Sequence, residues 1–229
     1  MRGGQSIGCI IPALNEAAGI ARVLAALPVW VDHVVVADNG STDGTADVAR
    51  AAGATVAVVH TRGYGAACLG GLSKLPAVDV IVFLDGDYSD FPEQMDTLVD
   101  PIVAGRADLV IGSRSLGGAE HGALTPQQRF GNWLATRLVR AFWGVRYTDL
   151  GPFRAIARSA LMRLGMDDRS FGWTVEMQIK AARQGLAALE RPVRYRRRIG
   201  TSKISGTVQG TLRAGTKILW LIAREAVRR

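Results

Sequence analysis

Cysteine, histidine and long apolar runs are all scarce in this sequence. The two cysteines, Cys9 and Cys68, show no metal-binding spacing and lie among apolar or small residues, so we expect buried free thiols in a reducing compartment. The three histidines form no catalytic pattern. No segment has the roughly 18 consecutive apolar residues of a membrane-spanning helix, and the first apolar stretch ends too early for a signal peptide. The sequence therefore predicts a cytoplasmic protein, soluble or peripheral on the cytosolic face of a membrane.

Acidic residues are almost absent from the last part of the chain. Residues 1–190 contain 17 Lys and Arg against 19 Asp and Glu, a net charge of −2. Residues 191–229 contain 11 Lys and Arg against Glu225 alone, a net charge of +10. This tail also has Trp220 within an aliphatic cluster, a composition that suits an anionic lipid surface or a phosphorylated ligand. The chain shows no nucleic-acid recognition module, so nucleic acid is not expected as a partner.

A chain of 229 residues, 48% of them hydrophobic, has enough apolar material for one α/β domain. Expected strands are residues 6–12, 33–38, 55–60, 78–84 and 108–112, and expected helices are residues 17–27, 45–52, 66–75 and 92–104. This alternation predicts a mainly parallel sheet built from βαβ units. Further along we expect a helix at 126–143, a strand at 152–156, a helix at 174–184, an extended segment at 187–195 and a helix from about 207. We divide the chain into a domain of residues 1–205 and an amphipathic helical extension of residues 206–229.

Two acidic residues follow the most apolar of the expected strands. Residues 80–84 are continuously apolar, which is typical of a strand buried on both faces, and Asp85, Gly86 and Asp87 come next. The carboxyl ends of parallel strands form the ligand crevice of such sheets. Two carboxylates there suit a hard divalent cation shared with a substrate diphosphate. The alternative is that Asp85 caps the next helix and Asp87 is an ordinary turn residue.

Three further loops are expected at the same edge of the sheet. They comprise residues 12–16, 38–45 and 62–67. Asn15 or Glu16 could simply cap the following helix, whereas a carboxylate such as Asp38 can accept a hydrogen bond from a base or ribose. Glycines such as Gly65 let the backbone approach a ligand, and the helix N-terminus beyond them favours a phosphate. Four loops at one edge predict a ligand-binding site.

The motifs IIPALNE, ADNGSTDGT, RGYGAA, FLDGDYSDFPE and GSR occur in this order. Over about residues 6–205 the chain resembles the family 2 inverting glycosyltransferases of GT-A fold, and within them the dolichyl- and polyprenyl-phosphate mannose and glucose synthases. The resemblance implies a UDP- or GDP-linked sugar donor, Mg²⁺ or Mn²⁺ held by Asp85 and Asp87, and a polyprenyl or dolichyl phosphate acceptor. The donor-binding residues that it implies are Pro12, Asn15, Glu16, Asp38, Asn39, Gly65, Asp85 and Gly86. Those implied near the diphosphate or the acceptor are Arg114, Arg129, Arg154, Arg198, Ser202 and Lys203.

The chain departs from the family pattern at three points. Asn39 stands where the family usually has a second aspartate, and Ser89 stands where lipid-phosphate synthases often have a glutamine that follows the metal aspartates. The membrane helices of some lipid-phosphate relatives are absent. These departures concern base recognition, the cation and the acceptor.

In the implied reaction the nucleoside diphosphate leaves the sugar, and fixed positive groups must stabilise the negative charge that develops on it. We expect Arg198 and Lys203 to close over the phosphates, because a guanidinium binds phosphate with two parallel donors and an ammonium acts as a point charge. A hydroxyl acceptor would also need a general base. Asp149 and Glu176 are the candidates, although either could be structural, Asp149 as a partner of Arg154 and Glu176 through the helix dipole. A phosphate acceptor needs no base.

The sequence thus predicts a metal-dependent inverting glycosyltransferase. Transfer to a soluble or hydroxyl acceptor, a nucleotidyltransferase on a similar sheet, and a non-catalytic nucleotide-sugar-binding membrane module are the alternatives. The sequence leaves the sugar, the base and the oligomeric state open. For the tail, a helix lying on an anionic membrane through residues 207–229 competes with packing of residues 218–222 on the domain or on a second subunit.

Overall fold

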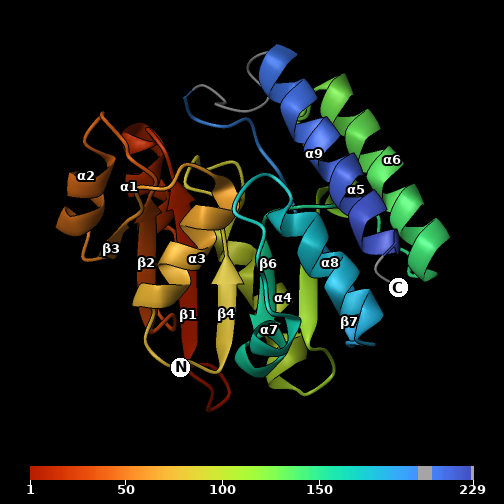
Figure 1. Ribbon diagram of the computed structural model, residues 1–229. Helices are drawn as coiled ribbons and strands as arrows, with labels where there is room; N and C mark the ends of the chain where they lie inside the picture. Colours follow the sequence, from red (N-terminus) through yellow and green to blue (C-terminus); the bar gives the residue numbers. More distant parts are fainter. Residues whose placement is uncertain (201–207, 228–229) are drawn as a thin grey trace.

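The computed structural model describes residues 1–200 and 208–227, in which helices cover both faces of a seven-stranded sheet (Figure 1). The strands are β1 (Ile7–Ala13), β2 (His33–Asp38), β3 (Thr55–Val58), β4 (Val80–Phe83), β5 (Leu109–Ser113), β6 (Arg154–Ala157) and β7 (Ala188–Pro192). The helices are α1 (Ala17–Ala25), α2 (Thr45–Ala51), α3 (Tyr64–Lys74), α4 (Met95–Val103), α5 (Arg114–Gly117), α6 (Pro126–Trp143), α7 (Arg158–Leu164), α8 (Trp173–Arg183) and α9 (Val208–Val227), with a 3₁₀ turn η1 (Pro92–Gln94) before α4.

The strand order β3-β2-β1-β4-β6-β5-β7 explains where a ligand can bind. Neighbouring strands are parallel except β6, which is antiparallel to β4 and to β5. From β1 the chain builds the sheet outward to β2 and β3 on one side, and then returns to β4 on the other. Ligands of open α/β sheets bind at such a switch point, outside the carboxyl ends of the strands. The predicted mainly parallel sheet is confirmed.

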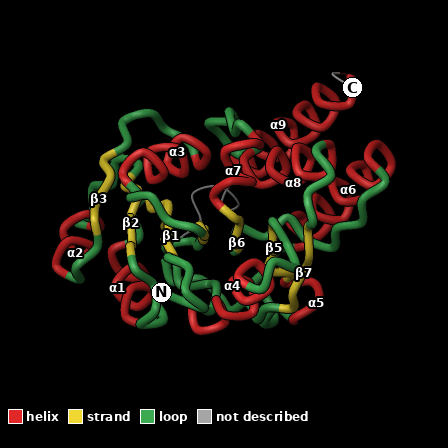
Figure 2. Tube along the Cα trace, turned by 90° about the horizontal axis from the view of Figure 1, so that it is seen from below, coloured by secondary structure: helices red, strands yellow, loops and turns green. Residues whose placement is uncertain are grey.

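Alternate residues of the central strands face opposite layers of helices. On β4, Ile81 and Phe83 belong to a core shared with α3 and α6–α9, whereas Val80 and Val82 belong to a core shared with α1, α2 and α4. Figure 2 shows the two groups of helices on opposite sides of the sheet. Because both faces of the sheet are covered, the run at β4 is continuously apolar rather than alternating.

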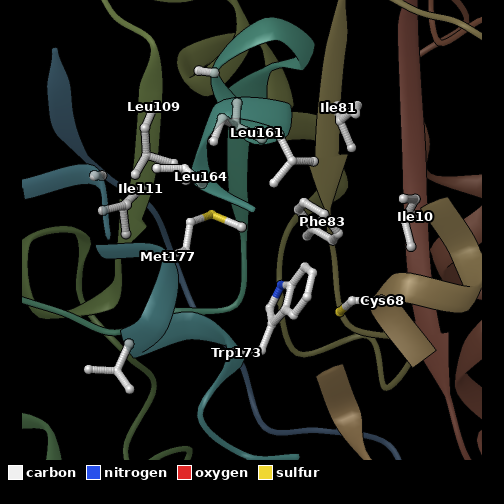
Figure 3. Close-up of a cluster of buried hydrophobic side chains, with 14 of the residues drawn as sticks. Ile10, Cys68, Ile81, Phe83, Leu109, Ile111, Leu161, Leu164, Trp173 and Met177 are labelled. Atoms are coloured by element: carbon white, nitrogen blue, oxygen red, sulfur yellow. The ribbon is translucent and has the colours of Figure 1, made fainter. Parts of the chain in front are cut away.

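The larger of these cores holds α8 against the sheet. The rings of Phe83 and Trp173 meet edge to face, with centroids 5.8 Å apart, and Met177 of the same helix packs beside them (Figure 3). Cys68 lies in this core and Cys9 in the other, and both are buried free thiols as predicted. This packing fixes the first turn of α8, next to the site described below.

The predicted elements are present, with two additions. Helix α7 follows β6 without a loop, and its seven residues are too few for a distinct periodic pattern. Helix α5 is a single turn in a stretch for which we expected no helix, and it is capped by the Ser113 side chain, which accepts from the Leu116 amide. Each of these short helices directly follows a strand, β5 or β6, which fixes where the helix begins.

The C-terminal helix is part of the same body. Leu221 and Ile222 of α9 are buried in the core that α6 and α8 share. The aliphatic cluster of the tail therefore packs on the domain through these two residues, while Leu219 and Trp220 of the same cluster stay exposed. The boundary proposed at residue 205 lies outside the described residues. No helix within the described ranges has the length and apolar character needed to cross a membrane.

Candidate active site

A pocket of about 250 Å³ opens at the carboxyl edge of the sheet, at the switch point between β1 and β4. Its walls come from the loops that follow β1, β2, β3 and β4, joined by two residues from later in the chain. The lining residues are Pro12, Ala13, Leu14, Glu16, Asn39, Arg62, Gly63, Tyr64, Ala67, Asp85, Gly86, Asp87, Phe171 and Arg198. The four loops that were expected to converge do so.

Asp85 and Asp87 lie where β4 ends. The Tyr64 hydroxyl donates to Asp85 Oδ1 over 3.0 Å, and Asp87 Oδ1 accepts from the Ser89 amide over 2.9 Å. Burial raises the pKa of Asp85 to about 7, and the charge of Asp87 adds to this rise. Tyr64 and Ser89 therefore hold the two carboxylates in place, but neither residue carries a positive charge to balance them.

Arg198 supplies part of that charge. Its guanidinium lies 2.5 Å from Glu16 Oε1 and 3.3 Å from Asp87 Oδ2, so it links the loop after β1 to the loop after β4. The next amide, of Ile199, donates to the Asp87 carbonyl over 2.9 Å. Arg198 thus lies on the acidic wall of the pocket, and its binding of phosphate stays a prediction.

A third carboxylate, Asp90, is buried behind the pair. It is 1% exposed, and neither of its oxygens has a hydrogen-bond partner among the described residues. Burial raises its pKa well above the usual value, and the charges of Asp85 and Asp87 act in the same direction. Such a concentration of acidic groups favours binding of a cation.

The donor set fits a divalent cation that is only partly held by protein. Carboxylate oxygens of Asp85 and Asp87 are hard ligands of the kind that Mg²⁺ and Mn²⁺ take. Within the described ranges, no group of three or more His, Cys, Asp or Glu residues is arranged to hold an ion by itself. An ion at this place would therefore need further oxygens from a ligand or water, which is usual for Mg²⁺ bound with phosphates.

Asn39 explains the departure from the family motif. Its Nδ2 donates to the Val59 and Thr61 carbonyls over 3.1 and 2.7 Å, and its Oδ1 accepts from the Gly63 amide over 2.8 Å. An aspartate has no donor for the two carbonyls. Asn39 therefore ties down the loop that carries Arg62 and Tyr64 into the pocket.

Asn15 and Asp38 lie beside the pocket and shape its loops. Asn15 has a φ of 53°, and its Oδ1 accepts from the Thr42 amide over 2.7 Å. Asp38 accepts from the Ser41 amide over 3.3 Å. Among the residues predicted in these loops, Pro12, Glu16 and Asn39 line the pocket itself.

The start of α3 is used for packing and does not face a phosphate. The amides of Gly65 and Ala66 donate to the Ser170 and Arg169 carbonyls, both over 3.0 Å. A Cβ atom at Gly65 would lie 1.9 Å from the Asp168 carbonyl oxygen. The expectation of a phosphate at this helix N-terminus is corrected: the glycines allow the 168–170 loop to approach.

The profile of Glycosyl transferase family 2 matches residues 9–165 of the chain. The chain belongs to this family. It is a glycosyltransferase, as the ordered motifs indicated.

Two relatives from family 2 cover nearly the whole chain. A glycosyltransferase of Mycobacterium tuberculosis, itself uncharacterised, is 34% identical over 210 residues, which cover 91% of this chain and 94% of that protein. An undecaprenyl-phosphate mannosyltransferase of Micrococcus luteus is 32% identical over 216 residues, which cover 88% of each protein.

Among solved structures, glucosyl-3-phosphoglycerate synthase of Mycobacterium tuberculosis has a similar fold. In its complex with Mn²⁺, UDP-glucose and phosphoglyceric acid it matches with a TM-score of 0.78 at 24% identity, over 98% of this chain and 81% of that chain. The GT-A fold expected for a family 2 glycosyltransferase is confirmed.

The two candidate bases of this glycosyltransferase are already engaged. Asp149 is 1% exposed, and its two oxygens accept from the Arg114 side chain over 2.7 and 2.8 Å. It therefore pairs with Arg114 and not with Arg154. Glu176 is fully buried and accepts from the Asp167 and Asp168 amides over 3.0 and 2.9 Å. Neither position suits a base that must reach a hydroxyl in the pocket.

The other predicted acceptor residues lie away from the pocket or outside the described residues. Arg154 is fully buried and donates to the Leu150, Gly151 and Thr174 carbonyls, so an acceptor contact does not fit its position. Arg129 is exposed near the start of α6. Ser202 and Lys203 are among the residues that are not described.

Seven pocket residues were missing from the predicted set, and three of them, Arg62, Tyr64 and Phe171, have polar or aromatic side chains. Arg62 and Tyr64 belong to the RGYGAA motif, whose polar members could have been included because they flank the glycines. Phe171 comes from a loop far along the chain, and no sequence signal marks it.

Glu176→Gln should destabilise the protein. Glutamine offers one acceptor oxygen where Glu176 serves two backbone amides and lies 2.6 Å from Lys180 Nζ, and hydrogen bonds of charged groups are worth about 1.5–3 kcal/mol. The free energy of unfolding, measured by denaturant titration, should fall by about that amount. Glu93→Gln, at an exposed position on η1, should leave it unchanged. Equal stability of the two variants would show that Glu176 is not a structural residue.

Proposed function

We propose that the protein transfers a sugar from a UDP- or GDP-sugar to a polyprenyl phosphate, with inversion and with the help of Mg²⁺ or Mn²⁺. One observation carries the proposal: Asp85, Asp87 and Arg198 line the same pocket at the switch point of the sheet, and Arg198 lies 3.3 Å from Asp87. Acidic groups that can hold a cation and a guanidinium that can bind phosphate are thus adjacent. A nucleoside diphosphate requires this combination.

The donor would lie with its nucleoside toward the loops after β1, β2 and β3 and its diphosphate toward Asp85 and Asp87. When bound, the divalent cation neutralises charge on the leaving diphosphate. Arg198 is within reach of the same phosphates and can donate to them with two parallel N–H groups. Its ion pairs with Glu16 and Asp87 must then loosen, because the phosphates compete for its donors.

The chemistry requires an in-line displacement at the anomeric carbon. The acceptor oxygen forms the new bond from the face opposite the diphosphate, and the diphosphate leaves with the electron pair of the broken bond. An ionised phosphate acceptor has no proton to lose. This agrees with a site in which Asp149 and Glu176 are both engaged elsewhere.

The acceptor rests on the relatives. The Micrococcus luteus protein is named as an undecaprenyl-phosphate mannosyltransferase, which supports a lipid phosphate for this chain. The structural neighbour was crystallised with phosphoglyceric acid, which supports the second candidate, a small soluble acceptor. Undecaprenyl phosphate and phosphoglyceric acid both carry a phosphate.

Loss of either metal-binding carboxylate should abolish turnover. Asp85→Asn and Asp87→Asn remove charge with little change of shape, and metal clamping contributes several kcal/mol, roughly three decades in rate. Release of UDP or GDP from the best nucleotide sugar, found by thermal-shift screening with Mn²⁺, should fall by at least about a thousandfold. Asp47→Asn, on an exposed side chain of α2, is the control. Full turnover of a folded Asp87→Asn protein, or of the wild type in EDTA, would contradict the metal role.

Comparison of two acceptors should distinguish the candidate functions. With the same donor, product formation is followed by mass spectrometry on undecaprenyl phosphate in detergent and on 3-phosphoglycerate. We expect transfer to the lipid phosphate and a product that mild acid cleaves, as expected for a glycosyl phosphate. Transfer to phosphoglycerate alone would refute the lipid acceptor while leaving the glycosyltransferase activity intact.

A further inference from the structure

Helices α6 and α9 form an outer layer on one side of the molecule and expose large apolar side chains. The two helices lie side by side (Figures 1 and 2), and Figure 1 shows that they project past the carboxyl ends of the central strands. Phe130 and Trp133 of α6 are 61% and 51% exposed, and Trp220 of α9 is 54% exposed. Both helices therefore expose large aromatic rings to solvent.

The exposed residues of α6 follow a helical spacing. Phe130, Trp133 and Arg137 are three and four residues apart, which places them on one face. Ala135 and Val139 lie on the opposite face and are buried in the core. The helix thus packs on the domain through its inner face, and its outer aromatic residues lie outside the core.

Charge on this layer has one sign. Helix α6 contains no Asp or Glu, and Arg129, Arg137 and Arg140 are exposed on it. No carboxylate of the described residues pairs with these three arginines, and the Arg137 guanidinium lies over the Trp133 ring, 5.6 Å from its centroid. The acid of α9, Glu225, is 2% exposed and is paired with Arg183 and Arg224.

The basic tail contributes less free charge than its sequence suggests. Arg196 donates to the Tyr88 and Asp90 carbonyls, and Arg198 is part of the pocket. On α9, Lys217 lies 2.8 Å from Asp168 Oδ2, and Arg224 is 2.9 Å from Glu225 Oε1. Three basic residues of the tail, Arg198, Lys217 and Arg224, are thus ion-paired inside the fold. Among the side chains that the structure describes on these two helices, the cations without a carboxylate partner are Arg129, Arg137 and Arg140 of α6.

We infer that the outer faces of α6 and α9 dock the protein on an anionic lipid bilayer. Tryptophan and other aromatic rings prefer the boundary between head groups and acyl chains, and arginines beside them can reach anionic head groups. Symmetric pairing of two copies through this layer would bring arginines together with no exposed carboxylate opposite them. The inference goes beyond the proposed reaction and extends the membrane contact expected for residues 207–229 to α6.

Co-sedimentation with vesicles tests the docking surface without any substrate. The full chain should bind vesicles of equal parts phosphatidylcholine and phosphatidylglycerol, and bind phosphatidylcholine alone much more weakly. Arg137→Glu should weaken binding to the anionic vesicles on the order of tenfold, because each basic residue near such a surface is worth about a factor of five. The double change Phe130→Ser with Trp133→Ser, and separately Trp220→Ser, should each reduce the part of vesicle binding that persists at high salt.

Matched controls lie on other faces. Arg22→Glu on α1 makes the same charge change, and Met162→Ser on α7 removes a comparably exposed apolar side chain, 55% exposed. Neither should alter vesicle binding, and circular dichroism should show all variants folded. The fluorescence of Trp133 and Trp220 should be quenched by lipids brominated in the acyl chains. Replacing either tryptophan with Phe should reduce the quenched part of the total fluorescence.

Three results would overturn the inference. One is the absence of binding to anionic vesicles at low salt. Another is binding that the Phe130 and Trp133 changes leave intact. The third is a wild-type dimer that these changes convert to a monomer without any vesicle binding, which would identify the layer as a self-association surface. Because no donor or acceptor is present, none of these results bears on the glycosyltransferase reaction.

Discussion

Negative charge gathered at the carboxyl end of β4 is the constraint on which the site depends. Asp85, Asp87 and Asp90 follow a strand that is buried on both faces, so their charges are poorly solvated and repel one another. These carboxylates therefore need positive charge from nearby groups to offset their repulsion. Arg198 brings some of it from the end of the domain, and a divalent cation with a diphosphate would complete it. This charge imbalance is the physical basis of the proposed binding of a metal-bound nucleotide.

The surrounding residues hold this acidic wall in position. Tyr64 donates to Asp85, and Tyr64 is itself placed by the loop that Asn39 ties down. The start of α3 is fixed in turn by the 167–170 loop, in which the Asp167 and Asp168 amides donate to Glu176. Buried polar groups therefore link residues that are more than one hundred positions apart in sequence. Asn39 and Glu176 thus serve to hold backbone segments in place.

Sequence patterns predicted the elements well because strands covered on both faces are continuously apolar and helices show a different period. They also predicted which loops meet, since parallel strands end at one edge. They did not predict the partners of buried polar groups: Arg154, Asp149 and Glu176 have the residue types of catalytic groups, but their hydrogen bonds involve carbonyls, amides and an arginine that only the folded chain brings near. The same holds for the tail: the sequence gives its net charge, but only the folded structure shows ion pairs such as that of Lys217 with Asp168.

The most direct measurement is calorimetry of UDP and GDP binding with and without Mn²⁺. If Asp85 and Asp87 hold a cation that the diphosphate shares, Mn²⁺ should strengthen binding of the preferred nucleotide by roughly a hundredfold, about 2.7 kcal/mol. The gain should vanish in the Asp87→Asn protein. Nucleotide binding that is equally tight with Mn²⁺ and with a chelator would contradict the account.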